Sequence, residues 1–176
     1  MKQEKQRAVE AIDAKAGLIH DVADQVWDFA ELSLQEKKSA ALYCEVLEKE
    51  GFTVERGICN IDTAFSGSFG SGRPVIGILA EYDALSGLSQ EGGLLEQKER
   101  VAGGCGHGCG HNLLGVGAAA AAMALREEME AGRYEIQLSD TAAAQVRTAC
   151  LLKRSLKEIH ALGGDYVSIL TKGATA

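Results

Sequence analysis

Four side chains that can bind metal ions alternate with other residues in the glycine-rich segment 103–112. Cys105, His107, Cys109 and His111 stand at every second position of this segment. Thiolate and imidazole groups are good ligands for zinc and related divalent ions. The glycines between them let the backbone bend so that two close side chains reach one ion, and alternate spacing suits an extended segment whose side chains share a face. The segment therefore predicts metal binding, but it does not identify a reaction.

Other interpretations of the same residues stay open at this point. The segment could be a glycine loop in which cysteines and histidines merely lie near each other, or a structural zinc site, although such sites usually draw on two separated ligand pairs. Cys109 and His111 could also act as a nucleophile and its base, but their two-residue spacing is better explained by shared metal ligation. Residues 115–120 match a dinucleotide-binding fingerprint, G-x-G-x-x-A, yet no predicted strand precedes them.

Two acidic residues follow a continuous apolar run. The run, residues 75–80, is typical of a strand that is covered on both faces, and Glu81 and Asp83 come directly after it. In open α/β sheets, ligands bind at the carboxyl ends of the strands. We therefore expect Asp83 to lie at the ligand-binding edge of a sheet, with simple capping of the strand as the alternative.

The remaining pattern predicts alternating helices and strands. Apolar residues at spacings of three and four predict one long first helix over residues 9–30 and a second over 36–50. The period then changes to that of strands over 52–58 and 61–69. Small residues dominate a further predicted helix over 113–131, which would let it approach a sheet closely. The fold class predicted from these elements is α/β.

The composition narrows the classes of function. The 176 residues carry a formal net charge of −7, which disfavours nucleic acid and anionic membranes as partners because both require clustered basic residues. Residues 1–10 are charged and lack the apolar stretch of a signal peptide, so we expect a cytoplasmic protein. Five cysteines, an odd number, indicate thiols or metal ligands rather than a disulfide framework. We expect Cys44, Cys59 and Cys150 to have packing roles.

Several segments resemble the M20 family of metallopeptidases. The residues of 76–90, which include the Ala-Glu-Tyr-Asp-Ala-Leu sequence, and those of 106–115, Gly-His-Gly-Cys-Gly-His-Asn-Leu-Leu-Gly, are similar to two motifs of this family. The similarity is to its amidohydrolase branch, which includes aminoacylases, auxin-conjugate hydrolases and p-aminobenzoyl-glutamate hydrolases. Residues 27–33 and 50–57 also resemble this branch. The resemblance covers roughly residues 8–132.

The resemblance implies an α/β catalytic domain with a mixed sheet flanked by helices. It implies a centre of two divalent ions, zinc or manganese, that hydrolyses the amide bond of an N-acyl or N-aroyl amino acid such as p-aminobenzoyl-glutamate. By the same resemblance Cys109 bridges the two ions, His111 binds one of them, and Asp83 is a supporting acid that orients the site. A homo- or hetero-oligomer with a related subunit is also expected.

The chain departs from the family pattern after residue 132. The family continues with a Pro-Ala-Glu-Glu-like motif that supplies the general base and a metal ligand, whereas residues 134–145 contain no adjacent glutamates. The net charge changes from −9 over residues 1–132 to +2 over 133–176, where a basic amphipathic helix is predicted. We therefore interpret 1–132 as the N-terminal part of an incomplete M20-like catalytic domain and 133–176 as a divergent tail, produced by a frameshift or truncation. Impaired activity is expected, with a non-catalytic remnant that binds a metal or pairs with an intact homologue as the alternative.

Overall fold

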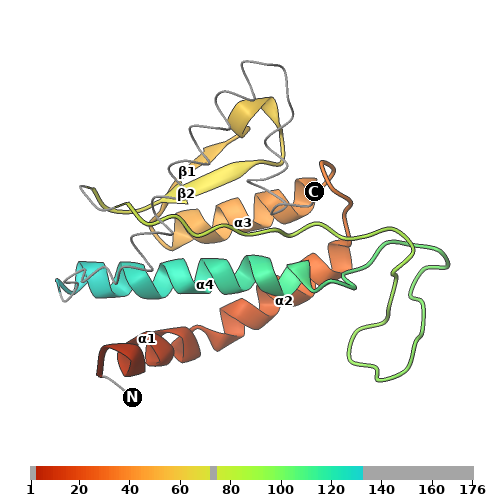
Figure 1. Ribbon diagram of the computed structural model, residues 1–176, viewed down its shortest axis with the longest axis horizontal. Coiled ribbons are helices and arrows are strands. Elements are labelled where there is room, and N and C mark those ends of the chain that lie inside the picture. Colours follow the sequence, from red (N-terminus) through yellow and green to blue (C-terminus); the bar gives the residue numbers. More distant parts are fainter. Residues whose placement is uncertain (1–2, 72–74, 133–176) are drawn as a thin grey trace, which may run out of the picture.

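The computed structural model describes residues 3–71 and 75–132, and these form four helices and a two-stranded antiparallel sheet (Figure 1). The elements in chain order are α1 (Gln3–Ala14), α2 (Ala16–Phe29), α3 (Lys37–Lys49), β1 (Thr53–Arg56), the 3-10 turn η1 (Ile58–Asn60), β2 (Phe65–Ser68) and α4 (His111–Glu130). Helix α4 packs against α1 and α2, and α2 also packs against α3. The predictions for residues 133–176 lie outside the described residues.

The N-terminal region is two helices rather than the single helix predicted over residues 9–30. The break falls at Lys15, whose backbone N–H donates to the carbonyl of Ile12 in a tight turn. The Lys15 ammonium group lies 2.9 Å from a carboxylate oxygen of Glu50 and 3.4 Å from one of Glu127. The break therefore coincides with an ion-pair contact that joins the helical N-terminus to α3 and α4, which the apolar periodicity does not reveal.

The core lies between α2, α3 and α4 and continues to the inner side of the hairpin. Its members are buried apolar side chains, most of them on these helices: Val22, Ala23, Val26, Ala40, Tyr43, Val46, Leu47, Phe52, Tyr82, Val116 and Met123. Burial of these faces removes apolar surface from water and is the main force that holds the helices together. Among the described residues, no helix combines the length and the apolar character needed to cross a membrane.

The hairpin is shorter than the predicted strands. Residues Thr53–Arg56 pair with Phe65–Ser68 in antiparallel register, with Thr53 opposite Ser68 and Arg56 opposite Phe65. Residues 61–64, predicted as part of the second strand, instead form a turn in which the Ala64 N–H donates to the carbonyl of Ile61.

The mixed sheet that we expected is absent from the described residues, because the apolar run 75–80 is extended but is not paired with a strand. Figure 1 shows this segment running along α3 and α4. Its apolar side chains are exposed, with 70% of Val75 and 53% of Leu79 accessible. A strand covered on both faces requires neighbours on both sides, and the described part of the chain supplies none. The prediction of a buried central strand is therefore wrong for this structure.

Candidate metal centre

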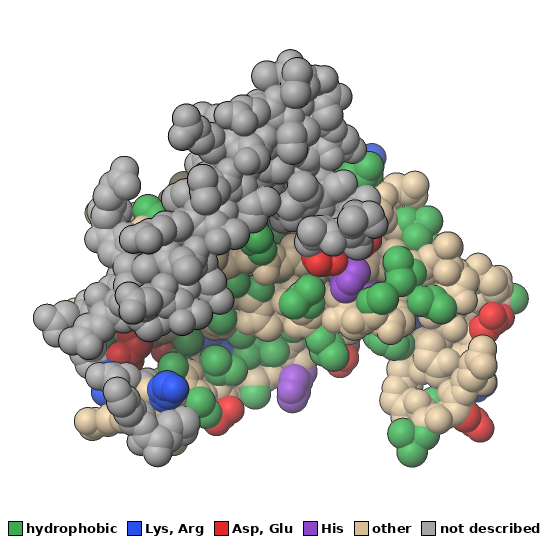
Figure 2. Space-filling view, in the orientation of Figure 1, with side chains coloured by type: hydrophobic (Ala, Val, Ile, Leu, Met, Phe, Trp, Pro, Cys, Tyr) green, Lys and Arg blue, Asp and Glu red, His purple; other side chains and the backbone are tan. Residues whose placement is uncertain are grey.

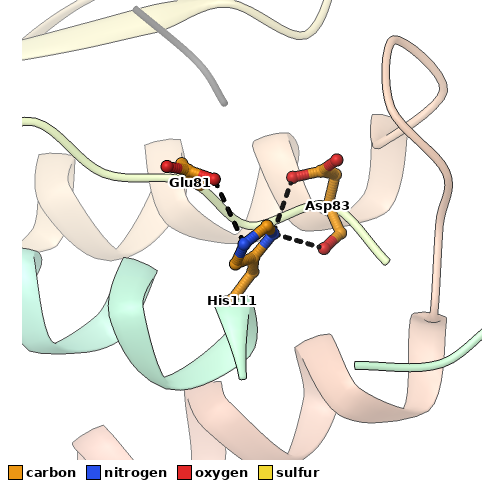
Figure 3. Close-up of side chains that lie close together, drawn as sticks. All are labelled: Glu81, Asp83 and His111. Atoms are coloured by element: carbon orange, nitrogen blue, oxygen red, sulfur yellow. Dashed lines mark hydrogen bonds and ion pairs between the residues drawn. The ribbon is translucent and has the colours of Figure 1, made fainter. Parts of the chain in front are cut away.

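Three ionisable side chains meet where the extended segment passes the first turn of α4 (Figure 3). The Nδ1 atom of His111 lies 2.9 Å from Oδ1 of Asp83, and its Nε2 atom lies 3.1 Å from Oε2 of Glu81. The possible ligand atoms of Glu81, Asp83 and His111 all lie within 4.8 Å of one another. Asp83 is buried, and the other two residues are partly buried. The cluster has the donor types and the spacing of a site for a divalent cation.

The segment that carries Glu81 and Asp83, the acidic arm of the cluster, is held in place without a sheet. On one side, the Ala84 N–H donates to the carbonyl of Glu31 across 2.8 Å. On the other side, Leu85 and Gly106 exchange two backbone hydrogen bonds of 2.9 Å each. A Cβ atom at Gly106 would lie 1.9 Å from the carbonyl oxygen of Leu88, so only glycine fits this contact. These bonds fix the backbone that carries Asp83 and bring the glycine-rich loop beside it.

The first turn of α4, which carries His111, is the imidazole arm of the cluster. The position of His111 depends on where this helix begins. Gly110 precedes the helix with φ of +75°, a left-handed conformation that glycine adopts without strain. His111 is therefore the first residue of α4, two residues earlier than the helix predicted over 113–131. The side chain of Asn112 donates to the carbonyl of Ala23 across 3.3 Å. This bond ties the first turn of α4 to α2 and so orients His111 toward the acids.

Gly115 allows the two arms to approach each other closely. A Cβ atom at this position would lie 2.4 Å from the hydroxyl oxygen of Tyr43 and 3.1 Å from the carbonyl oxygen of Glu81. The backbone of the acidic segment is therefore almost in contact with the helix at Gly115. Gly117, two residues further along the helix, has no neighbour within 4 Å of such a Cβ atom.

The electrostatic setting favours two acids at this position. The N-terminus of a helix carries a partial positive charge and unpaired N–H groups, and no side chain caps the N-terminus of α4. The carboxylates of Glu81 and Asp83 lie at this end of the helix. Each ring nitrogen of His111 lies within hydrogen-bond distance of a carboxylate oxygen.

The other residues of the loop that could bind a metal ion do not belong to the cluster. His107 is buried, its Nε2 atom donates to the carbonyl of Val26 across 3.0 Å, and Nδ1 has no hydrogen-bond partner among the described residues. Burial lowers the pKa of His107, and the charge of His111 adds to this effect. Cys109 is exposed, Cys105 is partly buried, and neither belongs to the cluster around His111. A turn closed by the Gly110 N–H and the His107 carbonyl separates the two histidines, so the alternate residues do not share one face.

A further acid is buried near the cluster. Glu36, at the start of α3, is only 2% exposed, and the hydroxyl of Thr63 hydrogen-bonds to its carboxylate. Burial raises its pKa, and the negative charge of Asp83 raises it further. A third acidic group, Glu36, is thus buried near the two acids of the cluster.

The surface around the cluster is apolar. Leu85, Leu113 and Leu114, which neighbour the cluster in sequence, are exposed. Figure 2 shows acidic and histidine side chains on this face with hydrophobic side chains around them. Apolar side chains near a few charged groups are the usual composition of a small-molecule site.

The donor set fits a divalent metal ion. Asp83 occupies Nδ1 of His111, which leaves Nε2 as the nitrogen that can bind a metal. Zinc bonds of about 2.0–2.2 Å to nitrogen and oxygen in a tetrahedral arrangement place the two ligand atoms roughly 3.3–3.5 Å apart. The Nε2 atom of His111 and Oε2 of Glu81 are 3.1 Å apart, so a small movement would open the pair to an ion.

The comparison with known proteins confirms the resemblance. Over 121 residues, 69% of the chain, the sequence is 49% identical to the B subunit of p-aminobenzoyl-glutamate hydrolase from Escherichia coli (strain K12). This chain is a partial homologue of that hydrolase component. It spans only 25% of the relative's length, and no protein-family model matches it. The homology thus links the chain to a subunit of an amidohydrolase over about a quarter of that subunit's length.

The sequence pointed to Asp83 and His111, and the structure brings these two together. It adds Glu81, which stands two residues before Asp83 and had no predicted role. The two-residue spacing of Glu81 and Asp83 predicts that both lie on one side, because residues at i and i+2 of an extended segment face the same side. Cys109, the other ligand implied by the family resemblance, lies outside the cluster of described residues.

Proposed function

We propose that this chain carries part of the metal centre of an M20-type amidohydrolase and that His111 binds a divalent ion, zinc or manganese, through Nε2. The observation that carries the proposal is the contact between Nδ1 of His111 and the Asp83 carboxylate at 2.9 Å. A carboxylate in this position fixes the tautomer and the orientation of a metal-binding imidazole. The partial homology to a component of a hydrolase supports the same assignment.

Besides His111, three residues have roles or candidate roles in this proposal. Asp83 orients the ring of His111 and is not itself a ligand. Glu81 is the second ligand that the geometry favours, and Cys109 is the second ligand that the family resemblance favours. When bound, a divalent ion would polarise the carbonyl of an amide substrate. The exposed side chains of Leu85, Leu113 and Leu114, which neighbour these residues in sequence, suit the acyl or aroyl group of such a substrate.

The substrate class that we propose is an N-acyl or N-aroyl amino acid, such as p-aminobenzoyl-glutamate. Turnover by this chain alone is expected to be very low. Residues 134–145 contain no adjacent glutamates, so the carboxylate that acts as general base in the family has no counterpart at that position. A non-catalytic remnant that binds a metal ion is the alternative that needs the fewest functional residues in this chain.

Metal titration of four matched proteins tests the proposal. Wild type, His111→Gln, Glu81→Gln and Cys109→Ser are titrated with Zn²⁺ and Mn²⁺ against a chromophoric chelator. We expect wild type to bind and His111→Gln to lose binding. Of the other two variants, the one that weakens binding identifies the second ligand. Equal affinity in wild type and His111→Gln would refute the proposed centre.

A second proposal concerns assembly with a related subunit. The apolar side chains of 75–80 are exposed, and this extended segment does not take part in a sheet among the described residues. An exposed apolar extended segment is a template for pairing with another chain, and the relative in Escherichia coli is named as one subunit of its enzyme. Ile78→Lys should abolish co-purification with an intact homologue, whereas Val9→Lys, an exposed position in α1, should not. Retained co-purification of Ile78→Lys would count against this surface.

For residues 133–176 we infer an out-of-frame or recombined origin. The support is the change of net charge from −9 to +2 after residue 132 together with the loss of the family motif. Translation of the downstream gene in the other two frames tests this idea. A Pro-Ala-Glu-Glu-like motif in one of them is expected, and its absence from both would rule out a frameshift.

A further inference from the structure

Two buried tyrosines connect the two arms of the cluster from the core side. Tyr82 lies between Glu81 and Asp83 in sequence, so in an extended segment its side chain points away from theirs. It is buried in the core, with its ring centroid 5.3 Å from that of Tyr43 on α3. Tyr43 in turn reaches the arm that carries His111.

The contact of Tyr43 with α4 is close. Its hydroxyl group donates to the carbonyl of Asn112 at 3.5 Å, a long hydrogen bond. More decisive is Gly115, where a Cβ atom would lie 2.4 Å from this hydroxyl oxygen. The same Cβ atom would lie 3.1 Å from the carbonyl oxygen of Glu81. The phenol therefore lies at the point where the acidic segment and the helix come closest.

Both rings are held firmly. Phe65 of β2 contacts each of them, with centroid separations of 6.2 Å to Tyr43 and 5.7 Å to Tyr82. The hydroxyl group of Tyr82 donates to the carbonyl of Thr63. Burial raises the pKa of both phenols, so both remain neutral donors. Rings with rigid neighbours and satisfied hydroxyl groups can set a distance between two backbone segments.

We propose that Tyr43 and Tyr82 are positioning residues that together form a spacer and set the separation between the Glu81–Asp83 segment and the first turn of α4. The pair thereby keeps Asp83 within hydrogen-bond distance of His111. The functional importance of the spacer rests on the proposed function, because it matters only if His111 is a metal ligand. The spacing itself is a property of the metal-free chain.

The test uses the metal-free chain and a control from the same core. Tyr43→Leu and Tyr82→Leu are compared with Phe52→Leu, which removes a ring at the Phe52–Phe69 contact, where the centroids are 5.8 Å apart. The readout is the downfield proton resonance of the His111 Nδ1–H group, assigned by its absence from His111→Gln. We expect both tyrosine variants to lose this resonance through exchange with water and Phe52→Leu to keep it.

Retention in both tyrosine variants, equal loss in Phe52→Leu, or absence from wild type would each overturn the spacer. A second pair of variants decides the matter if the leucine variants do not fold. Gly115→Ala should weaken the resonance, and the double variant Gly115→Ala with Tyr43→Phe should recover part of it, because the oxygen nearest the new methyl group is gone. No recovery would contradict the proposed contact.

Zinc affinity of the same variants separates the two proposals. A lost orienting interaction lowers metal affinity by roughly 10- to 100-fold, and we expect this for both tyrosine variants. If wild type binds no zinc, the proposed function fails, whereas the His111 resonance still decides whether the tyrosines position the cluster.

Discussion

His111 and Asp83 are 28 residues apart in sequence, and Nδ1 of the histidine lies 2.9 Å from the aspartate carboxylate. The backbone carbonyl of Asp83 lies 3.1 Å from the same nitrogen. One residue thus presents two acceptors to a single ring nitrogen. This arrangement leaves the opposite nitrogen, Nε2, directed at Glu81 and available to an ion.

Asp83→Asn should weaken metal binding with little change in fold. The asparagine oxygen can still accept a hydrogen bond, but the negative charge that holds the imidazole is lost. We expect the zinc dissociation constant to rise by about 10- to 100-fold, measured by competition with a chelator. Asp24→Asn, at an exposed position of α2, is the control and should bind as wild type does. An unchanged dissociation constant in Asp83→Asn would mean that the contact does not serve a metal site.

Two glycine substitutions in α4 should have opposite effects on stability. Gly115→Ala places a methyl group 2.4 Å from the Tyr43 hydroxyl oxygen, and such overpacking costs about 1–3 kcal/mol. Gly117→Ala meets no atom within 4 Å, and alanine in an open helical position stabilises by roughly 0.5–1 kcal/mol. Urea unfolding of the two variants measures both effects. Equal stabilities would show that Gly115 does not lie close to the Tyr43 hydroxyl group.

The buried His107 should make the fold less stable in mild acid. Burial lowers its pKa from the ordinary value of 6.5, so the unfolded chain takes up a proton more readily than the folded one. The resulting contribution to stability is present above pH 6.5 and is lost as the pH falls through the lowered pKa. The difference between the unfolding free energies measured above and below this pH range should be smaller in His107→Gln than in wild type. His20→Gln, at an exposed position, should keep the pH dependence of stability that wild type shows. A pH dependence in His107→Gln equal to that of wild type would exclude His107 as its source.

Glu36 should act in the opposite direction at lower pH. Burial raises its pKa above the ordinary 4.5, so its contribution to stability is complete below that value and is lost as the pH rises through the raised pKa. Glu36→Gln keeps an acceptor for the Thr63 hydroxyl group and removes the titration. The variant should therefore gain stability relative to wild type as the pH rises from about 4 to 7. Glu55→Gln, an exposed position of β1, should show no such relative gain, and a flat difference for Glu36→Gln would contradict the prediction.

Local patterns predicted most of the helices. The helix over 36–50 matches α3 closely, because its apolar spacing and the glycine at position 51 are local signals. The break at Lys15 was not predictable in this way, since its cause is a contact with Glu50 and Glu127 from distant parts of the chain. The prediction of a buried strand over residues 75–80 was wrong for a related reason. Its hydrophobicity indicates a need for burial, but neighbouring strands are required to meet that need.

The candidate site was predictable in part. Acids after an apolar run and a histidine after a glycine loop are signals in the sequence, and they led to Asp83 and His111. The different fates of His107 and Cys109 were not predictable, because they depend on a turn between His107 and Gly110 and on the carbonyl of Val26. Alternate spacing predicts a shared face only while the backbone stays extended.

X-ray absorption at the zinc edge tests most directly whether His111 binds the metal, with wild type, His111→Gln and Cys109→Ser loaded with one equivalent of Zn²⁺. We expect wild type to show imidazole scattering with a zinc–nitrogen distance of about 2.0–2.1 Å and His111→Gln to lose it. A sulfur contribution that disappears in Cys109→Ser would add this cysteine to the ligand set. Imidazole scattering that is unchanged in His111→Gln would show that His111 does not bind the metal.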